Sequence, residues 1–254
     1  MTGRLFVVGL GPGDPRQLTG EAEAAIAAAE AIYGYGPYLD RLPSRPCQSR
    51  HPSDNREEPA RAEAALRHAE KGAVVALVSG GDPGVFAMAA TVCDAIEAGP
   101  ETWRTIDVAI VPGITAALAV AARVGAPLGD DFCVISLSDN LRPWPLVEER
   151  LRAAASAGFV LALYNPASRG RSWQLGAAFA ALATVLPAET PVIFGHAIGR
   201  EGERVSVTNV IRAGNEPADM ATLVIVGSAE TRAIARPGLS PLVYTPRARG
   251  RAVT

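Results

Sequence analysis

The sequence has few of the residues from which metal sites, disulfide frameworks and nucleic-acid surfaces are built. Its 254 residues include three cysteines and three histidines, and both kinds are widely scattered. This pattern predicts reduced thiols in a cytoplasmic protein, with no zinc site and no disulfide framework. The formal net charge is −2, so the charge balance gives no reason to expect a nucleic acid or a membrane surface as partner.

Long apolar runs and lysine are also scarce. No apolar stretch approaches the roughly 20 residues that span a membrane, and the N-terminus lacks the regions of a signal peptide. Lys71 is the single lysine, and every other cationic side chain is arginine. A GC-rich genome explains this bias most simply, whereas the functional alternative is that arginine suits bidentate binding of carboxylates and phosphates. The remaining composition is that of a globular protein.

The most informative stretch lies at the start of the chain. The apolar run Leu5–Val8 predicts a buried strand, and glycines follow it at positions 9, 11 and 13. Thr19 is a candidate N-cap for a helix over residues 22–31. Asp14 occupies the place of the last glycine in the dinucleotide-binding motif, and no Walker A lysine follows. The end of this strand is therefore a candidate ligand site of another kind, or a tight turn without a ligand.

Two further strand, glycine-loop and helix units follow. Residues 73–78 predict a strand that leads into Gly80-Gly81-Asp82, and residues 106–111 predict one that leads into Gly113. All three turns are expected side by side at one end of a parallel sheet. A carboxylate such as Asp82 repels phosphate but accepts hydrogen bonds from ribose hydroxyls or an amine. It therefore favours a ligand with a sugar, an amine or a positive centre.

The rest of the chain continues as alternating helices and strands. Residues 33–38, rich in tyrosine and glycine, and residues 43–59, rich in proline, are predicted as loops. A linker near residue 128 separates an N-terminal α/β domain (1–128) from a C-terminal α/β domain (129–246), and residues 247–254 are expected to be disordered. Further predicted helices cover 60–71, 115–124, 145–157 and 172–186. Further predicted strands cover 132–137, 159–164, 191–196, 205–208 and 222–227. The strand over 222–227 is expected to be the last of the chain.

Three motifs in this order resemble one family. They are V-G-x-G-P-G-D-x-x-x-L-T at Val8–Thr19, G-D-P at Gly81–Pro83 and P-G-I-T at Pro112–Thr115. From residue 4 to about 245 the chain is similar to the tetrapyrrole (corrin/porphyrin) methylases, which use S-adenosylmethionine. Segments such as Ser79–Phe86 and Leu163–Arg169 are most similar to the branch that methylates precorrin-3B at C17.

The resemblance implies a fold, a reaction and partners. The fold is two α/β domains of the class III methyltransferase type, with the active site in a cleft between them, in a homodimer. The reaction is methylation of precorrin-3B at C17 with ring contraction to precorrin-4, in cobalamin (vitamin B12) biosynthesis. S-adenosyl-L-methionine is the cofactor, S-adenosyl-L-homocysteine its product, a tetrapyrrole the substrate, and no metal is expected. Alternatives are a sibling methylase (cobalt-precorrin-3 C17 or precorrin-4 C11), a non-catalytic tetrapyrrole carrier, or a nicotinamide-dependent oxidoreductase, which Asp14 disfavours.

The resemblance also implies site residues. Pro12 and Arg169 are expected to contact the substrate, and Asp139 is the first candidate for the proton transfer of ring contraction, ahead of Asp14. The candidate cofactor-binding residues come from the second and third glycine-loop regions and from the second half of the chain: Gly80, Gly81, Asp82, Val85, Phe86, Thr115, Ala116, Tyr164, Ala197 and Thr222.

Overall fold

The structure is a computed structural model that describes residues 3–54, 56–140, 142–168, 170 and 172–247. The chain forms two compact units, residues 1–116 and 117–254. Both combine helices with a central sheet, as the predicted α/β class requires. The predicted domain boundary near residue 128 lies just beyond α5 (Ala116–Val124), and the first residue of α5 is the last residue of the first unit.

The first unit is built on a five-stranded parallel sheet with the order β3-β2-β4-β1-β5. The central strands β1 and β4 carry apolar side chains on both faces, because helices cover both sides of the sheet. This order brings the carboxyl ends of β1, β4 and β5 together at one edge. The strands are β1 (Arg4–Gly9), β2 (Ala31–Tyr35), β3 (Ser49–Ser53), β4 (Val74–Ser79) and β5 (Asp107–Val111).

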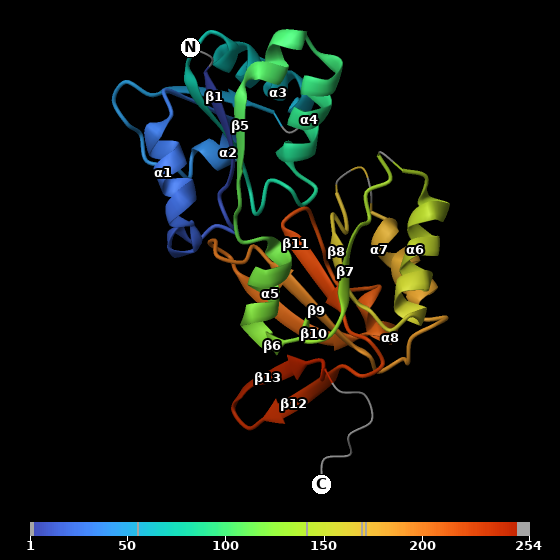
Figure 1. Cartoon of the computed structure of the whole chain (residues 1–254). Helices are drawn as coiled ribbons and strands as arrows, with labels where there is room; N and C mark the ends of the chain where they lie inside the picture. The colour runs from blue at the N-terminus through green and yellow to red at the C-terminus, as the bar shows by residue number, and fades with distance from the viewer. Residues whose placement is uncertain (1–2, 55, 141, 169, 171, 248–254) are drawn as a thin grey trace. The chain divides into compact units, whose positions relative to one another are not determined.

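The helices of this unit lie on opposite faces of the sheet, with α1 on one side and α3 and α4 on the other (Figure 1). Successive residues of β1 divide between these layers: Val7 packs in the α3–α4 core and Val8 in the α1 core. Thr19 caps α1, since its Oγ1 accepts a hydrogen bond from Ala22 N at 3.1 Å. The helical segments are η1 (Pro15–Gln17), α1 (Gly20–Ala28), α2 (Gly36–Leu39), α3 (Glu58–Glu70), α4 (Met88–Ala98) and η2 (Glu101–Thr105).

Two segments predicted as loops contain regular structure. The tyrosine-rich segment forms the end of β2 and then α2. Gly34 lies inside the strand, and glycine is needed there because a Cβ would lie 2.6 Å from Val78 Cγ2. The proline-rich segment contains β3, which pairs only with β2 at the edge of the sheet. Pro52 is compatible with this position, since an edge strand leaves one row of backbone groups unpaired.

The second unit contains a mixed sheet with the order β10-β9-β11-β8-β7. β7 and β8 are parallel, whereas β11 runs antiparallel between β8 and β9. The amino end of β11 therefore lies at the same edge as the carboxyl ends of β8 and β9. The strands are β7 (Phe132–Ser136), β8 (Val160–Tyr164), β9 (Pro191–His196), β10 (Arg204–Asn209) and β11 (Thr222–Val226).

Helices cover both faces of this sheet as well (Figure 1). α6 (Trp144–Ser156), α7 (Gln174–Leu182) and α8 (Val210–Ala213) contribute to one apolar core with the strands. α5 packs so closely on β9 that a Cβ at Gly195 would lie 2.8 Å from Val120 Cγ1.

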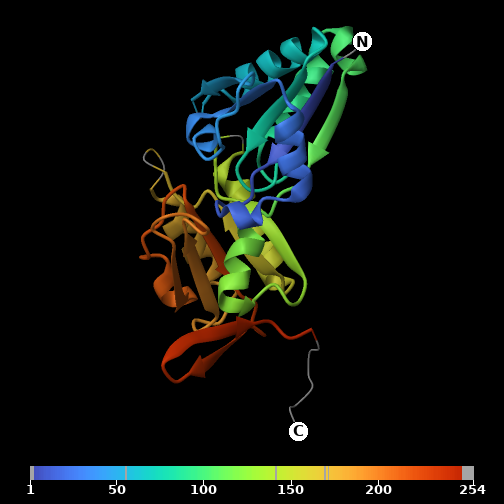
Figure 2. The ribbon, with the colours of Figure 1, turned by 90° about the vertical axis from the view of Figure 1, so that its left-hand side faces the viewer.

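The prediction that β11 is the last strand is wrong. β12 (Arg232–Arg236) and β13 (Leu239–Tyr244) form an antiparallel hairpin, and β13 also pairs with the short β6 (Gly125–Ala126). Figure 2 shows this hairpin at the end of the second unit, beyond its five-stranded sheet. The buried contact of Thr231 with Thr245 (Oγ1–Oγ1 2.8 Å) closes the base of the hairpin.

Candidate functional site

The three glycine loops of the first unit meet at the carboxyl edge of its sheet, as the sequence predicts. Gly11 and Gly81 donate to each other's carbonyl oxygens at 3.1 and 2.9 Å, which joins the loops after β1 and β4. Gly9 packs against the other two loops, because a Cβ there would lie 2.7 Å from Gly81 O and from Gly113 N. The loops therefore contact one another through their backbones, and glycine is needed at these points whether or not a ligand binds.

Asp82 links the second loop to the third. Its Oδ1 accepts from Gly84 N at 2.8 Å, and its Oδ2 accepts from Gly113 N at 3.0 Å. An ionised carboxylate offers about four acceptor positions, so these two bonds leave capacity for a ligand donor. Asp82 thus has a structural role that the sequence did not reveal, in addition to the predicted binding role.

The predicted cofactor residues of the first unit lie around this junction. The absent Cβ of Gly81 would stand 3.8 Å from Thr115 Cα and 3.9 Å from Ala116 N, so ordinary space separates these backbones. At Gly80, by contrast, there is no room for a side chain, because a Cβ would lie 2.8 Å from the Tyr38 ring.

Phe86 is the least regular residue of the second loop. Its φ is 51°, in the left-handed region, and its side chain is 44% exposed. A bulky residue with positive φ costs energy, and such strain gathers at ligand-binding sites. Val85, its half-buried neighbour, donates to Asp82 O at 3.3 Å and shapes the turn.

The first loop carries the predicted substrate contact, Pro12, which is half-buried. Arg41 supports this loop by donating to Leu10 O at 3.3 Å and Gly11 O at 3.2 Å. Asp14, the second candidate for proton transfer, caps η1 and binds the Arg16 guanidinium at 2.7 Å. The geometry therefore gives Asp14 a capping role.

The predicted cofactor residues of the second unit lie along one edge of its sheet. Tyr164 ends β8, and its hydroxyl accepts from Ala117 N in the first turn of α5 at 3.0 Å. Ala197 follows β9 with a φ of 51° and donates to Ala221 O at 2.9 Å. Thr222 begins β11, directly opposite the last residue of β9. The antiparallel direction of β11 is what brings these three residues together.

Asp139, the candidate proton-transfer residue, follows β7 at this same edge. Its Oδ1 accepts from Gln174 Nε2 at 3.2 Å. Beside it, Asn165 adopts a φ of 54° and donates to Ser136 Oγ at 3.0 Å, which joins the ends of β7 and β8. The predicted substrate contact Arg169 lies outside the described residues.

The structure also contains a polar cluster around Asp219 that no sequence pattern predicted. Its carboxylate accepts from Thr222 Oγ1 at 2.9 Å and lies 3.3 Å from His196 Nε2. Burial acts to raise the pKa of Asp219, but hydrogen bonds from Thr222, Ala221 N and His196 outweigh it and the pKa is lowered. His196 and Asp219 are far apart in sequence, so only the pairing of β9 with β11 unites them.

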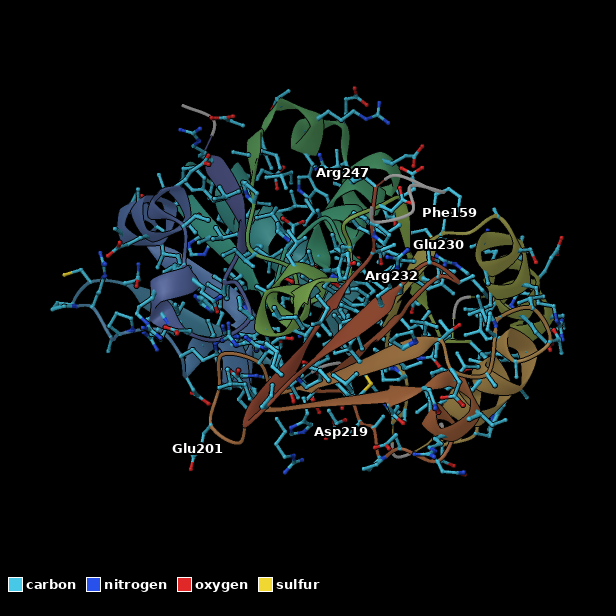
Figure 3. The ribbon with its side chains drawn as sticks, turned by 90° about the horizontal axis from the view of Figure 1, so that it is seen from below. Phe159, Glu201, Asp219, Glu230, Arg232 and Arg247 are labelled. Carbon is cyan, nitrogen blue, oxygen red and sulfur yellow. The ribbon has the colours of Figure 1, made fainter. Side chains whose placement is uncertain are left out.

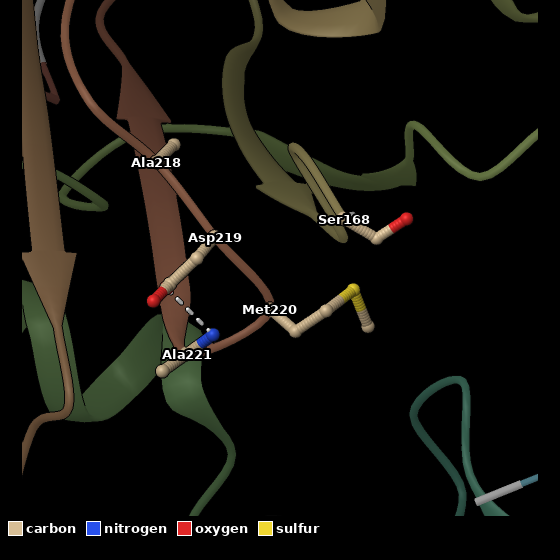
Figure 4. A pocket seen from close by; sticks show the side chains of 5 residues that line it. All are labelled: Ser168, Ala218, Asp219, Met220 and Ala221. Carbon is tan, nitrogen blue, oxygen red and sulfur yellow. Dashed lines mark hydrogen bonds between the residues drawn. The ribbon is translucent and has the colours of Figure 1, made fainter. Parts of the chain in front are cut away.

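Asp219 lines two open pockets of the second unit. One, of about 500 Å³, also contains Ser168 and Met220. Figure 4 shows the Met220 thioether on the Ser168 side of the loop, with the Asp219 carboxylate pointing away from it. The other contains His196 and Arg204. Figure 3 shows Asp219 in the loop before β11.

Among the residues that the structure describes, no group of three histidine, cysteine or acidic side chains is arranged to hold a metal ion. Within the same residues, no helix combines the length and apolar character needed to cross a membrane. All three cysteines, Cys47, Cys93 and Cys133, are unpaired.

Comparison with known proteins identifies the family. A sequence model described as Tetrapyrrole (Corrin/Porphyrin) Methylases matches residues 4–213. The chain belongs to this family. This tetrapyrrole methylase is 61% identical over 247 residues to the Precorrin-3B C(17)-methyltransferase of Sinorhizobium sp., covering 97% of each chain.

Two further comparisons agree with this family. The Probable cobalt-factor III C(17)-methyltransferase of Salmonella typhimurium is 40% identical, covering 89% of this chain and 93% of its own. The crystal structure of the methyltransferase CobJ matches with a TM-score of 0.89 and 44% identity, covering 96% of this chain and all of that one. The predicted family and its two-domain α/β fold are thereby confirmed.

Proposed function

We propose that this tetrapyrrole methylase transfers the methyl group of S-adenosylmethionine to C17 of precorrin-3B and contracts the ring to precorrin-4, in cobalamin biosynthesis. The observation that carries the proposal is the 61% identity, over 97% of both chains, to a precorrin-3B C17-methyltransferase. The glycine loops lie within the residues that the family model matches, and we assign the binding edge to them.

The residues present suit this cofactor. S-adenosylmethionine supplies a methyl group made electrophilic by its sulfonium, and it also carries ribose hydroxyls and an amine. Asp82 retains acceptor capacity for such donors beyond its two backbone partners. Gly81 leaves the backbone bare beside Thr115 and Ala116. We assign the binding role to these four residues, together with Gly80, Val85, Phe86, Tyr164, Ala197 and Thr222.

The main task of the chain in methyl transfer is alignment. The electron-rich C17 attacks the methyl carbon while the carbon–sulfur bond electrons return to sulfur, so S-adenosylhomocysteine leaves neutral at sulfur. Holding the two carbons in line provides most of the acceleration, because it removes the entropy cost of their encounter. Rigid elements, such as the joined glycine loops, suit this role.

Ring contraction requires more than alignment. The C20 bridge leaves the macrocycle as an acetyl group that stays attached to the product, and this rearrangement needs a proton-transfer group. We assign that role to Asp139, whose carboxylate lies at the loop edge of the second unit and is held by Gln174.

A product analysis tests the proposal. Purified protein given S-adenosylmethionine and precorrin-3B is expected to yield precorrin-4, with one added methyl group. Mass spectrometry counts the methyl groups, and carbon-13 at C20 reports contraction. In the Asp139→Asn variant methylation is expected to survive while contraction slows, since the amide keeps the shape but cannot titrate. Methyl addition at C11 or C1 would contradict the C17 assignment. Full ring contraction by Asp139→Asn would mean that another residue carries out the proton transfer.

A second candidate is methylation of the cobalt-containing substrate at the same carbon. Its support is the 40% identity to the probable cobalt-factor III enzyme. Competition between the metal-free and cobalt-containing substrates in one assay distinguishes the two, and we expect preference for precorrin-3B because the identity to that enzyme is higher.

We further propose a cytoplasmic homodimer. The unpaired cysteines agree with a reducing compartment, and closed two-fold dimers are the commonest assembly of soluble enzymes. Light scattering at micromolar concentration is expected to report twice the 26.4 kDa chain mass. A mass near one chain would contradict the dimer without affecting the proposed reaction.

A further inference from the structure

Gln174 is a buried amide that the proposed chemistry has not yet used. It is the first residue of α7, and its side chain is 1% exposed. Its Nε2 donates to Asp139 Oδ1 at 3.2 Å, while its Oε1 is buried and has no hydrogen-bond partner among the described residues. The amide nitrogen therefore has a hydrogen-bond partner in Asp139, whereas the amide oxygen has none among the described residues.

Folding stability does not account for this arrangement. A buried acceptor without a partner costs about 1–3 kcal/mol. Leu175, Leu137 and their neighbours form an apolar core around the start of α7, in which methionine would occupy the same volume without that cost. The glutamine is thus the less stable choice, and its described polar contact is with Asp139.

The contact suits the positioning of a carboxylate. Asp139 lies in the loop after β7, with no helix or strand of its own to fix its rotamer. The amide donates from a buried and therefore immobile side chain. Because an amide does not titrate, it holds the carboxylate over the whole working pH range.

A structural role is the competing explanation. The hydrogen bond joins the loop after β7 to the start of α7, and it therefore resembles a simple tie between two loops. Trp144, the first residue of α6 beyond that loop, also meets Trp173, the residue before α7, edge to face with ring centroids 4.9 Å apart. The aromatic pair already supplies a tie between these regions.

We propose that Gln174 is a positioning residue that orients the Asp139 carboxylate for the proton transfer of ring contraction. The proposal rests on the proposed function of the chain and on the role of Asp139 in it. Gln174 itself neither gives nor takes a proton.

Gln174→Met is the principal test variant, because it keeps the volume and removes the donor. Thr190→Val is a matched control: Thr190 Oγ1 is likewise buried without a partner, and the residue lies in the turn before β9. Both variants are expected to unfold at the wild-type temperature or above and to bind S-adenosylhomocysteine as the wild type does. Only Gln174→Met is expected to lose contraction rate, by at least tenfold in kcat with KM unchanged.

A double-variant cycle separates positioning from packing. If Gln174 acts through Asp139, adding Gln174→Met to Asp139→Asn has no further effect on contraction. Wild-type kcat in Gln174→Met, or an equal loss in both backgrounds, would overturn the positioning role while the wild-type reaction stands. If the wild-type protein itself fails to convert precorrin-3B, the proposed function and this inference both fall.

Discussion

Gly113→Ala is expected to destabilise the protein and to weaken S-adenosylhomocysteine binding at least tenfold. A Cβ at this position would overlap the carbonyl oxygen of Gly81 and would lie 2.9 Å from Gly9 Cα. These neighbours are backbone atoms that cannot rotate away, so the loops themselves must move apart. Forcing extra volume into a packed region costs about 1–3 kcal/mol, and the displaced loops carry the proposed cofactor residues.

Gly20→Ala is the matched control for this substitution. Gly20 begins α1, and a Cβ there would meet no atom within 4 Å. Alanine is better than glycine in a helix by up to about 1 kcal/mol, so stability is expected to hold or rise slightly. Chemical denaturation and titration calorimetry measure both quantities. Wild-type stability and affinity in Gly113→Ala would mean that the loops tolerate separation.

Asp82→Ala is expected to reduce the affinity for S-adenosylhomocysteine by roughly 1–3 kcal/mol, which is about 5- to 150-fold. Two losses contribute, because the carboxylate bonds to Gly84 N and Gly113 N disappear together with the proposed ligand contact. Calorimetry on the purified variant gives the affinity, and the denaturation midpoint gives the stability.

Asp82→Asn separates the two contributions. The amide keeps one oxygen, so it can still accept from one of the two backbone donors, but its NH₂ group cannot accept from the other. If the charge itself binds the ligand amine, Asp82→Asn is expected to lose nearly as much affinity as Asp82→Ala while losing less stability. An affinity that falls only in proportion to stability would limit Asp82 to its loop-joining role, and an unchanged affinity would remove it from the binding site.

Much of the first unit could be predicted from the sequence because its signals are local. The apolar runs that became β1, β4 and β5 each lead into a loop that contains glycine, and parallel strands bring such loops to one edge. β2 and β3 were missed for physical reasons. Gly34 and Tyr35 suggested a loop, and β3 is a polar edge strand whose form depends on pairing with β2.

The candidate site residues at the sheet edge of the second unit could not be predicted from any short segment of the sequence. Thr222 begins its strand, whereas Tyr164 ends its strand and Ala197 follows the end of another. The three residues meet only because β11 runs antiparallel. Without the resemblance to the family, nothing local joins them. The contact of Asp219 with His196 and the burial of Gln174 likewise arise from tertiary packing.

The backbone contacts among the three glycine loops also limit how this scaffold could be redesigned. Gly9 and Gly113 occupy space that a side chain cannot share, and Gly81 has a φ of 67°, a backbone conformation that other residues rarely adopt. A change at one of these glycines therefore demands compensating changes in the neighbouring loops. A mutant library aimed at new tetrapyrroles should therefore leave these three codons fixed.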